Sequence, residues 1–268
     1  MSTTDATNPA ESSPRSYHQD LSQATAVFSD EFQFPGHGIA PEVPSFIEAD
    51  RLVMAARPGM LRKLLPLRID NNGVFCGGTY AFTTVAEAAA YGDWCANELK
   101  LDGETLFLDR PEFLEPRSQV WSVAGIEDFG HVDQQKVMRV ERWHALKPPS
   151  LSEFTASWWP KIRSAAVESG ATSAWLLLGA GPIHTQIGLV TAFDADISSA
   201  DQGASSAEIR RIESLASLGQ GFEAECAATK VFDRTSWIYM IWHPIAEGDD
   251  FPAAAEWPVS PPLFGLPL

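Results

Sequence analysis

Apolar and polar positions alternate with a period of two along residues 24–34. The even positions carry mainly alanine and phenylalanine and the odd positions are largely polar, which is typical of a strand with one buried face. Asp30 is the exception, because it places a carboxylate on the apolar face. Further β-rich runs at 61–69 and 74–83 predict two strands. The Asn-Asn-Gly sequence at 71–73 predicts a hairpin turn between them, because these residues tolerate positive φ angles.

Capping boxes predict where the helices begin. A proline followed by Ser-x-x-Glu starts a helix at 45–56 and another from residue 150. Thr-x-x-Glu and Ser-x-x-Glu sequences start helices at 85–99 and from residue 205. Pro160 lies inside the helix that begins at 150, so we expect a kink there or a division into two helices.

The remaining runs complete two copies of one pattern. They predict a short extended piece at 105–108 and strands at 119–126, 136–146, 171–178, 183–193 and 237–243. Strand, helix, strand, strand, helix, strand therefore occurs twice. We predict an α+β fold in which tandem ferredoxin-like β-α-β-β-α-β repeats form a pseudo-dimeric α+β barrel, because packing their open sheet faces together buries both. Two independent ferredoxin-like domains are the alternative.

This pattern also predicts the domain organisation. The two ferredoxin-like halves are expected at 21–130 and 131–245, after a flexible N-terminal tail at 1–20 that is rich in Ser, Thr, Pro and Asn. A Pro-rich C-terminal arm at 246–268 carries Trp257 and is too apolar to lie free in solvent. We therefore expect the arm to cover a groove or another subunit, which makes a homodimer through the arm the predicted assembly.

Composition restricts the partners and the compartment. A net charge of −16 and a pI of about 4.7 disfavour binding to nucleic acid and to anionic membranes. Three cysteines without CxxC spacing argue against a disulfide framework or a structural zinc site. No segment has a signal-peptide core or the ~20 apolar residues of a membrane span. The sequence predicts a soluble cytoplasmic protein without nucleic-acid or membrane partners.

Three short motifs resemble a known group of proteins. They are Pro-Gly-Met-Leu-Arg-Lys at 58–63, Gly-Gly-Thr-Tyr-Ala-Phe at 77–82 and an alanine-rich helix at 86–91 that ends in tyrosine. These sequences resemble the YdhR-like group of proposed mono-oxygenases in the dimeric α+β barrel superfamily, over residues 20–130. The chain departs from the group at Leu64 and Leu65, where a tryptophan is usual, and in being a tandem rather than one unit that dimerises.

The resemblance implies a site in the cavity between the sheet and the helices of a half. It further implies a small aromatic or phenolic substrate and a reaction without metal or organic cofactor, in which the deprotonated substrate itself activates oxygen. The sequence contains no His-x-His, His-Glu-x-x-His or CxxC motif that would favour a metal site. Haem ligation through His144, His184 or His243 is a less favoured alternative.

Residues on the predicted strands supply the candidate catalytic groups. Asp30, on a phenylalanine-lined face, is a candidate base, because burial raises the pKa of a carboxyl group. Tyr80 and Tyr239 are candidate hydrogen-bond donors to a developing oxyanion. His144, His184 and His243 are candidate proton shuttles, because histidine titrates near neutral pH. Each of these residues also has a structural alternative, as a strand-end aspartate, a core tyrosine or a structural histidine.

Charged and aromatic residues supply the candidate binding groups. Arg139 and Glu141 alternate on one face of the strand at 136–146, where they either orient a polar ligand or form a cross-sheet salt bridge. Nine tryptophans suit a packed core or a cavity for a flat aromatic ligand. The predicted substrate-binding set is Phe32, Trp121, Arg139, Glu141, Trp143, Trp175 and Trp242.

These observations favour a cofactor-independent enzyme that acts on a small aromatic or phenolic substrate, as a mono-oxygenase by resemblance. One alternative is an acid–base lyase that releases a small carbonyl fragment, such as formaldehyde, from a phenolic compound. A non-catalytic binding protein for an aromatic ligand is the other. The pattern does not indicate which half holds the working cavity.

Overall fold

The computed structural model describes residues 21–34, 57–70, 73–100, 103–111, 113–130, 135–147, 150–180, 185–194 and 219–242. The strands in these ranges are β1 (Ala26–Phe34), β2 (Met60–Asp70), β3 (Gly73–Phe82), β4 (Leu114–Asp128), β5 (Val137–Ala145), β6 (Ser173–Ala180), β7 (Thr185–Phe193) and β8 (Ala228–Trp242). The helices are α2 (Val85–Asn97), α3 (Leu151–Glu168) and α5 (Gly221–Glu225), with 3-10 turns η1 (Leu21–Gln23) and η2 (Phe107–Asp109).

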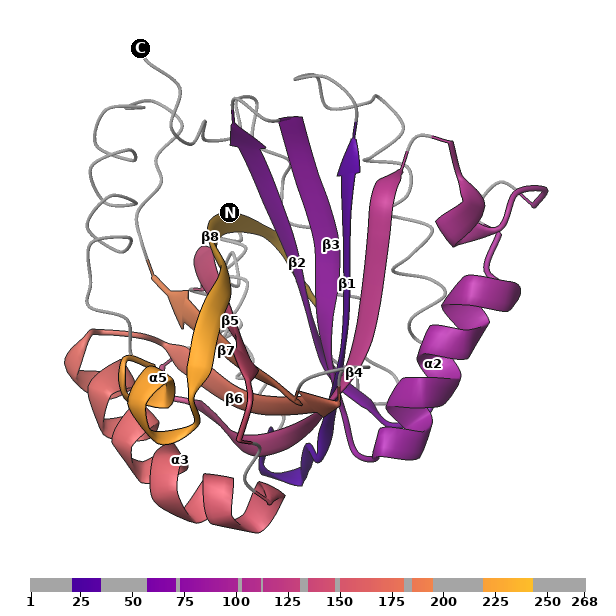
Figure 1. Cartoon of the computed structure of the whole chain (residues 1–268). Helices are drawn as coiled ribbons and strands as arrows, with labels where there is room; N and C mark the ends of the chain where they lie inside the picture. Colours follow the sequence, from indigo (N-terminus) through magenta and orange to yellow (C-terminus); the bar gives the residue numbers. More distant parts are fainter. Residues whose placement is uncertain are drawn as a thin grey trace, which may run out of the picture.

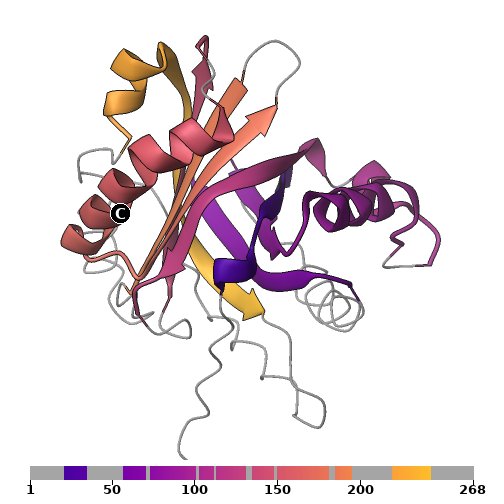
Figure 2. The ribbon, with the colours of Figure 1, turned by 90° about the horizontal axis from the view of Figure 1, so that it is seen from below.

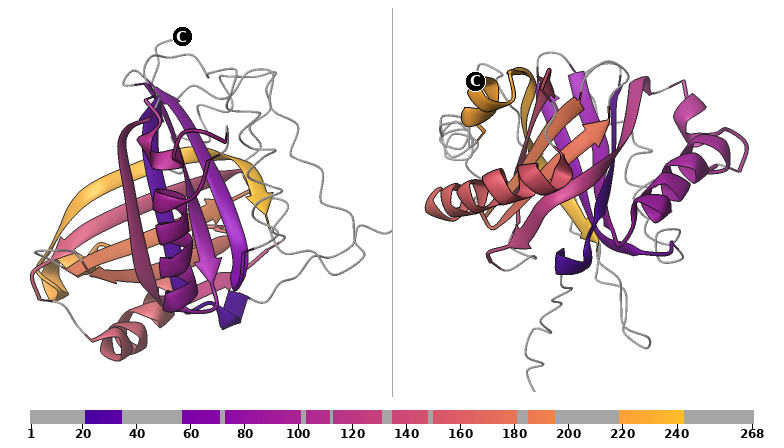
Figure 3. Two further views of the ribbon diagram at one scale, coloured as in Figure 1. Left: turned by 90° about the vertical axis from the view of Figure 1, so that its right-hand side faces the viewer. Right: turned by 60° about the horizontal axis from the view of Figure 1, so that its bottom comes forward.

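The eight strands close into one antiparallel barrel, in the order β1-β3-β2-β8-β5-β7-β6-β4. The first half contributes β4-β1-β3-β2, and the second half repeats this ferredoxin-like order as β8-β5-β7-β6. The halves join edge to edge, through β2 with β8 and through β4 with β6 (Figures 1 and 3). This topology confirms the predicted tandem α+β barrel and excludes two independent domains.

Apolar side chains fill part of the barrel interior. Val27 of β1, Trp121 of β4 and Trp175 of β6 belong to one buried cluster there. The indole nitrogens are satisfied inside the barrel, since Trp121 donates to Ser29 Oγ and Trp175 to Ser173 Oγ, both at 2.8 Å. An eight-stranded barrel holds side chains and at most one small ligand. Val27 and Ser29 are odd positions of β1, so the odd positions of this strand face the interior.

Helices cover the outer faces of the two halves. The even positions of β1 face α2, where Phe28 and Tyr91 share a buried cluster. In the second half, α3 and α5 pack on the sheet, and Trp143 of β5 meets Phe222 edge-on with ring centres 5.0 Å apart. Figures 1 and 2 show α2 on one side of the barrel and α3 and α5 on the opposite side. Each half thus has its own sheet–helix layer outside the shared barrel.

Two of the predicted helix starts are confirmed. Thr84 caps α2, with its Oγ1 accepting from Glu87 N at 3.1 Å. Ser150 caps α3 with a complete capping box that it forms with Glu153. The α3 helix continues through Pro160, so the predicted division into two helices is wrong; packing of the buried side chains on either side of the proline holds one continuous helix. The helices predicted at 45–56 and from 205 lie outside the described residues.

Three predicted elements differ from the structure. Strand β8 begins at Ala228 instead of residue 237, because its charged first part is neutralised by partners on other strands. Strand β4 is longer at both ends than the predicted 119–126. The predicted extended piece at 105–108 overlaps the 3-10 turn η2, which hydrogen-bonds locally from Asp109 N to Leu106 O at 3.0 Å.

The predicted limits of the halves remain predictions, and both the N-terminal tail and the C-terminal arm lie outside the described residues. Within the described ranges, the helices are all too short or too polar to cross a membrane.

Candidate active site

Asp30 and Tyr80 form a buried hydrogen-bonded pair on the outer face of the first half. The Tyr80 hydroxyl donates to Asp30 Oδ2 at 3.3 Å. Tyr80 is 3% exposed and Asp30 is 6% exposed. The pair forms because β1 and β3 are in register, with Asp30 opposite Gly78. A Cβ at Gly78 would lie 2.2 Å from the Tyr80 hydroxyl oxygen. The glycine therefore makes room for the tyrosine to reach the carboxylate.

Aromatic rings and a lysine surround this pair. The Tyr80 ring centre lies 5.7 Å from that of Phe28 and 4.9 Å from that of Tyr91. Lys63 of β2 is fully buried, and its Nζ lies 4.8 Å from the centre of the Tyr80 ring. An ammonium and a carboxylate thus flank one phenol in an apolar setting, where electrostatic interactions are stronger than in water.

A cavity of about 280 Å³ lies beside these rings. Its lining residues are Arg57, Pro58, Phe82, Ala86, Glu87, Ala90 and Tyr91. Tyr91 lines the cavity and also contacts Tyr80, so one ring connects the cavity to the Tyr80–Asp30 pair. At the rim, a hydrogen bond from Thr83 is the main cause that lowers the pKa of Glu87 below its ordinary value of 4.5. The rim thus presents a carboxylate at neutral pH.

This arrangement has the parts needed for proton transfer to and from a small planar molecule. The carboxylate of Asp30 can accept a proton, the Tyr80 hydroxyl can donate a hydrogen bond, and the Lys63 ammonium can stabilise a developing negative charge. The neighbouring cavity has a largely aromatic and aliphatic lining suited to an apolar ring.

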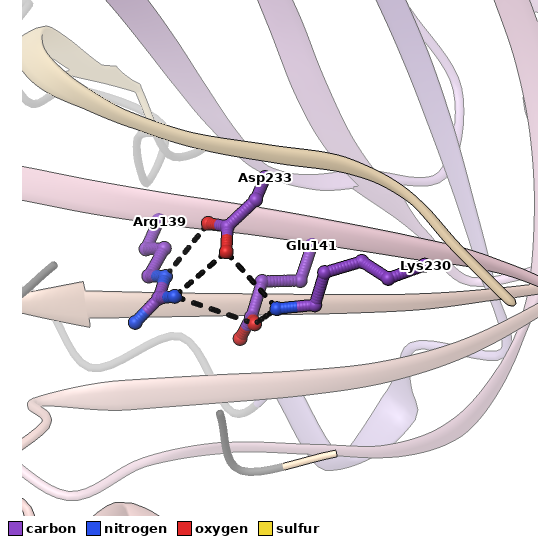
Figure 4. Close-up of polar contacts among 4 residues, drawn as sticks. All are labelled: Arg139, Glu141, Lys230 and Asp233. Carbon is purple, nitrogen blue, oxygen red and sulfur yellow. Dashed lines mark hydrogen bonds and ion pairs between the residues drawn. The ribbon is translucent and has the colours of Figure 1, made fainter. Parts of the chain in front are cut away.

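The outer face of the second half contains an ion cluster instead (Figure 4). Arg139 donates through Nε and Nη2 to the two oxygens of Asp233, at 2.9 and 2.8 Å. Lys230 Nζ donates to Asp233 Oδ2 at 3.0 Å and also to Glu141 Oε1. Arg139 Nη2 lies 3.5 Å from the same Glu141 oxygen. Arg139 and Glu141 therefore pair along β5, and each forms a salt bridge across to β8, through Asp233 and Lys230, which agrees with the structural one of their two predicted roles.

The cluster shifts the pKa values of its members. Burial by itself raises the pKa of Asp233, but hydrogen bonds from Arg139 and Lys230 outweigh it and hold the pKa below the ordinary value of 3.8. Burial by itself lowers the pKa of Lys230, but hydrogen bonds to Glu141 and Asp233 raise it above 10.5. Two cations and two carboxylates balance in the cluster, and the shifted pKa values keep Asp233 and Lys230 ionised across a broad range of pH.

The other predicted site residues lie apart from the Tyr80–Asp30 pair. Phe32 stacks on Phe113 with ring centres 4.3 Å apart, in a different cluster of the first half. Trp121 and Trp175 belong to the barrel interior and Trp143 to the second sheet–helix layer. His144 is half-buried on β5 of the second half.

The side chains of four other predicted site residues lie outside the described part of the structure. Tyr239 and Trp242 belong to β8, but their side chains are outside the described part of the structure. His184 and His243 lie outside the described residues altogether.

Lys63 and Tyr91 were missed as site residues by the reasoning from sequence. Both occur in the motifs that carry the family resemblance, Lys63 at the end of the Pro-Gly motif and Tyr91 at the end of the alanine-rich helix. A lysine inside an apolar strand run was a further signal, because a lysine is rarely buried unless a partner compensates its charge. In the described part of the chain, no three His, Cys, Asp or Glu side chains lie close enough together to hold a metal ion.

The barrel of two ferredoxin-like halves places the protein in the dimeric α+β barrel fold. A proposed monooxygenase from Fusobacterium nucleatum has a similar structure, with a TM-score of 0.51 and 10% sequence identity over 82% of this chain and 94% of that one. An anthrone oxidase-like protein is also similar, with a TM-score of 0.48 and 12% identity over 87% of this chain and 98% of that one. A proposed monooxygenase from Lactobacillus acidophilus has a TM-score of 0.48 and 10% identity, over 82% and 96% of the two chains.

At 10% identity, the likeness to the Fusobacterium nucleatum protein supports the fold alone and does not extend to the chemistry. No protein-family model and no curated protein sequence matches the chain. The narrower resemblance to the YdhR-like group remains a prediction.

Proposed function

We propose that the first half holds a cofactor-independent enzyme site that mono-oxygenates a small aromatic or phenolic compound. The observation that carries this proposal is the buried hydrogen bond from Tyr80 to Asp30, within an aromatic cluster that adjoins a cavity of about 280 Å³. A buried carboxylate beside a phenol and an ammonium is costly unless it is compensated, and such groups concentrate at functional sites.

The proposed reaction balances without an external reductant. Asp30 accepts the phenolic proton, and the phenolate transfers one electron to dioxygen. The resulting radical pair joins through a new C–O bond at a ring carbon, and the peroxide anion takes the proton back from Asp30. Loss of water from this hydroperoxide then breaks the O–O and C–H bonds to give a quinone. One oxygen atom ends in the carbonyl group and the other in water. Lys63 and Tyr80 stabilise the negative charge on the substrate oxygen.

The first half is favoured as the location of the enzyme site because the polar side chains on the outer faces of the two halves have different surroundings. In the second half the polar side chains pair among themselves in the Arg139–Asp233–Lys230–Glu141 cluster. In the first half the polar groups lie next to an apolar cavity, and a displacement of the Tyr91 ring would let a ligand in the cavity reach them.

Oxygen uptake on addition of a panel of phenols tests the proposal. We expect uptake with the wild-type protein and a fall in kcat/KM of roughly 100-fold or more in Asp30→Asn and Tyr80→Phe, the scale of general acid–base catalysis. Asp194→Asn, which removes an exposed carboxylate paired with Lys136, is the matched control and should retain activity.

Two other outcomes would support the alternative functions. Turnover in the strict absence of oxygen, with release of a carbonyl fragment, would replace mono-oxygenation by the lyase reaction. Saturable binding of phenols without any product would identify a binding protein. Activity that survives both substitutions would show that the site has been assigned wrongly.

A further inference from the structure

Arg57 is a cation without an ionic partner beside the cavity of the first half. It lines the cavity of about 280 Å³, and its guanidinium carbon lies 3.5 Å from the ring centre of Trp94. Its Nε is buried and has no hydrogen-bond partner in the described part of the chain, where no salt bridge to the group occurs either. Because the protein has 35 acidic and only 19 basic residues, the missing partner does not reflect a shortage of carboxylates.

The Trp94 ring determines how Arg57 presents its donors. At 3.5 Å from the ring centre the guanidinium is at stacking distance, so it lies flat on the indole and its N–H groups point sideways in its own plane. The Trp94 ring centre in turn lies 5.9 Å from that of Tyr91, which lines the cavity. The stack therefore holds an N–H edge beside the cavity, in the geometry that binds both oxygens of a carboxylate.

Glu87 also lines the cavity, but its carboxylate already has donors. It accepts hydrogen bonds from the hydroxyl groups of the two threonines that precede α2, and a Cβ added at Gly59 would lie 2.1 Å from its Oε2. Glu87 and Trp94 are about two turns of α2 apart, which is roughly 10 Å along the helix axis. No hydrogen bond or ion pair joins the two described residues Glu87 and Arg57, so the guanidinium edge is open to a ligand.

The second half contains a similar cation over a tryptophan, but there the cation is paired. Lys161 Nζ lies 4.4 Å from the centre of the Trp158 ring and 3.3 Å from Glu225 Oε1. A cation that only covers a tryptophan can thus have a carboxylate partner in this fold. Arg57 differs because it borders a cavity and the described residues give it no such partner, which leaves it available to an anionic ligand.

We infer that the substrate of the first half is a phenolic compound that also carries a carboxylate group, and that Arg57 binds this carboxylate. The inference rests on the proposed function, which it makes more specific. The carboxylate accepts two hydrogen bonds from the guanidinium edge, and the substrate ring lies in the apolar cavity against Phe82 and Tyr91. The carboxylate orients the substrate and takes no part in the oxygen chemistry.

Isothermal titration calorimetry of the full-length protein under anaerobic conditions tests the inference without requiring turnover. The probes are 4-hydroxyphenylacetate and neutral 4-hydroxyphenylacetamide, in which a methylene group separates the phenol from the variable group. We expect the wild type to bind the acid at least tenfold more tightly than the amide, as is typical of a hydrogen bond to a charged group. Arg57→Gln should weaken acid binding about tenfold and leave amide binding nearly unchanged.

Two further variants control the measurement. Arg57→Lys keeps the charge but lacks the planar fork, so its preference for the acid should fall between those of the wild type and Arg57→Gln, and it maintains the test if Arg57→Gln does not fold. Lys161→Gln, which removes the paired cation over Trp158, is the matched control and should keep the full preference. Loosening of the fold would weaken acid and amide alike, so the ratio of their affinities reports on Arg57 itself.

Oxygen uptake with the same two phenols separates this inference from the proposed function. A preference for the acid that depends on Arg57, without oxygen uptake, would support carboxylate recognition and overturn mono-oxygenation. Uptake with equal kcat/KM for acid and amide would support mono-oxygenation and overturn the role of Arg57. Equal affinity of the wild type for both probes, no binding of the acid at millimolar concentration, or a preference that persists in Arg57→Gln would each overturn the inference.

Discussion

Asp30 and Glu141 occupy the same position in the two halves: each is the fifth of nine residues in the first strand of its half, and each is buried. Asp30 pairs with Gly78 of β3, whereas Glu141 pairs with Leu189 of β7, the equivalent strand of the second half. Glu141 lies in a balanced ion cluster, and Asp30 instead accepts a hydrogen bond from Tyr80. The two halves have the same topology but different chemistry at this position.

Gly78→Ala should disrupt the Tyr80–Asp30 pair directly. A Cβ there would lie 2.2 Å from the tyrosine hydroxyl, so the ring must move away from the carboxylate. We expect kcat/KM for the active phenol to fall at least tenfold and the free energy of unfolding to fall by about 1–3 kcal/mol, as is typical of overpacking. Kinetics and urea unfolding measure the two effects.

The control for this substitution is Gly130→Ala, where the nearest atom to an added Cβ is a Thr172 methyl at 3.4 Å, an ordinary contact. It should leave both quantities close to those of the wild type. Full activity in Gly78→Ala would argue against a role for the Tyr80 hydroxyl.

Tyr91→Leu should join the cavity to the Tyr80–Asp30 pair. The tyrosine ring lines the cavity and lies 4.9 Å from the Tyr80 ring centre, so its removal enlarges the accessible space. We expect two-ring phenols to gain several-fold in kcat/KM relative to one-ring phenols, with a loss of about 1–3 kcal/mol in stability from the missing ring contacts. Competition kinetics between the two substrate sizes provides the measurement.

Phe113→Leu is the matched control for this prediction, because Phe113 is a buried aromatic residue in a separate cluster with Phe32. It should lower stability to a similar extent without altering the preference for substrate size. An equal change of preference in both variants would indicate a general loosening of the fold.

The ion cluster of the second half predicts how stability depends on pH. The folded pKa of Asp233 is below 3.8, so its stabilisation is fully present above pH 3.8 and is lost as the pH falls through the lower folded value. The folded pKa of Lys230 is above 10.5, so its stabilisation is fully present below pH 10.5 and is lost as the pH rises through the higher folded value. Between these limits the contributions of Asp233 and Lys230 should be constant.

Urea unfolding of the wild type and Asp233→Asn over this range of pH tests the prediction. The two proteins should differ in stability at pH 7 and converge as the pH falls below 3.8. Asp194→Asn removes a carboxylate from an exposed pair with Lys136, and it should show little difference from the wild type at any pH, because exposed pairs contribute little. A constant difference between wild type and Asp233→Asn down to the lowest pH would contradict the assigned pKa.

The first part of strand β8 could not be predicted from the hydrophobic pattern. Its second part is apolar and was predicted, but its first part carries Lys230, Asp233 and Arg234, which do not fit a buried strand. Their charges are compensated by Glu141, Arg139 and Glu31, which lie 89 to 203 residues away in the chain. No local window of sequence contains both members of such pairs.

Only part of the candidate site could be predicted, because its members also lie far apart in the chain. Asp30 was noticed because a carboxylate interrupts an apolar face, and Tyr80 because it lies in a glycine-rich strand motif. Their contact depends on the register of β1 with β3, which places Gly78 opposite Asp30. The tryptophans were expected either to pack in the core or to line a ligand cavity. Trp121 and Trp175 pack in the barrel interior, and Trp143 packs in the sheet–helix layer of the second half.

The amino-acid sequence by itself determined the elements and their twofold repetition, because hydrophobic period, turn residues and helix caps act over a few neighbouring positions. Only the tertiary structure decided which edges join to close the barrel and which charges compensate one another. It also decided that Asp30 meets Tyr80 while Glu141 meets Lys230. These relationships depend on strand register and on contacts between distant segments, which become defined only when the whole chain has folded.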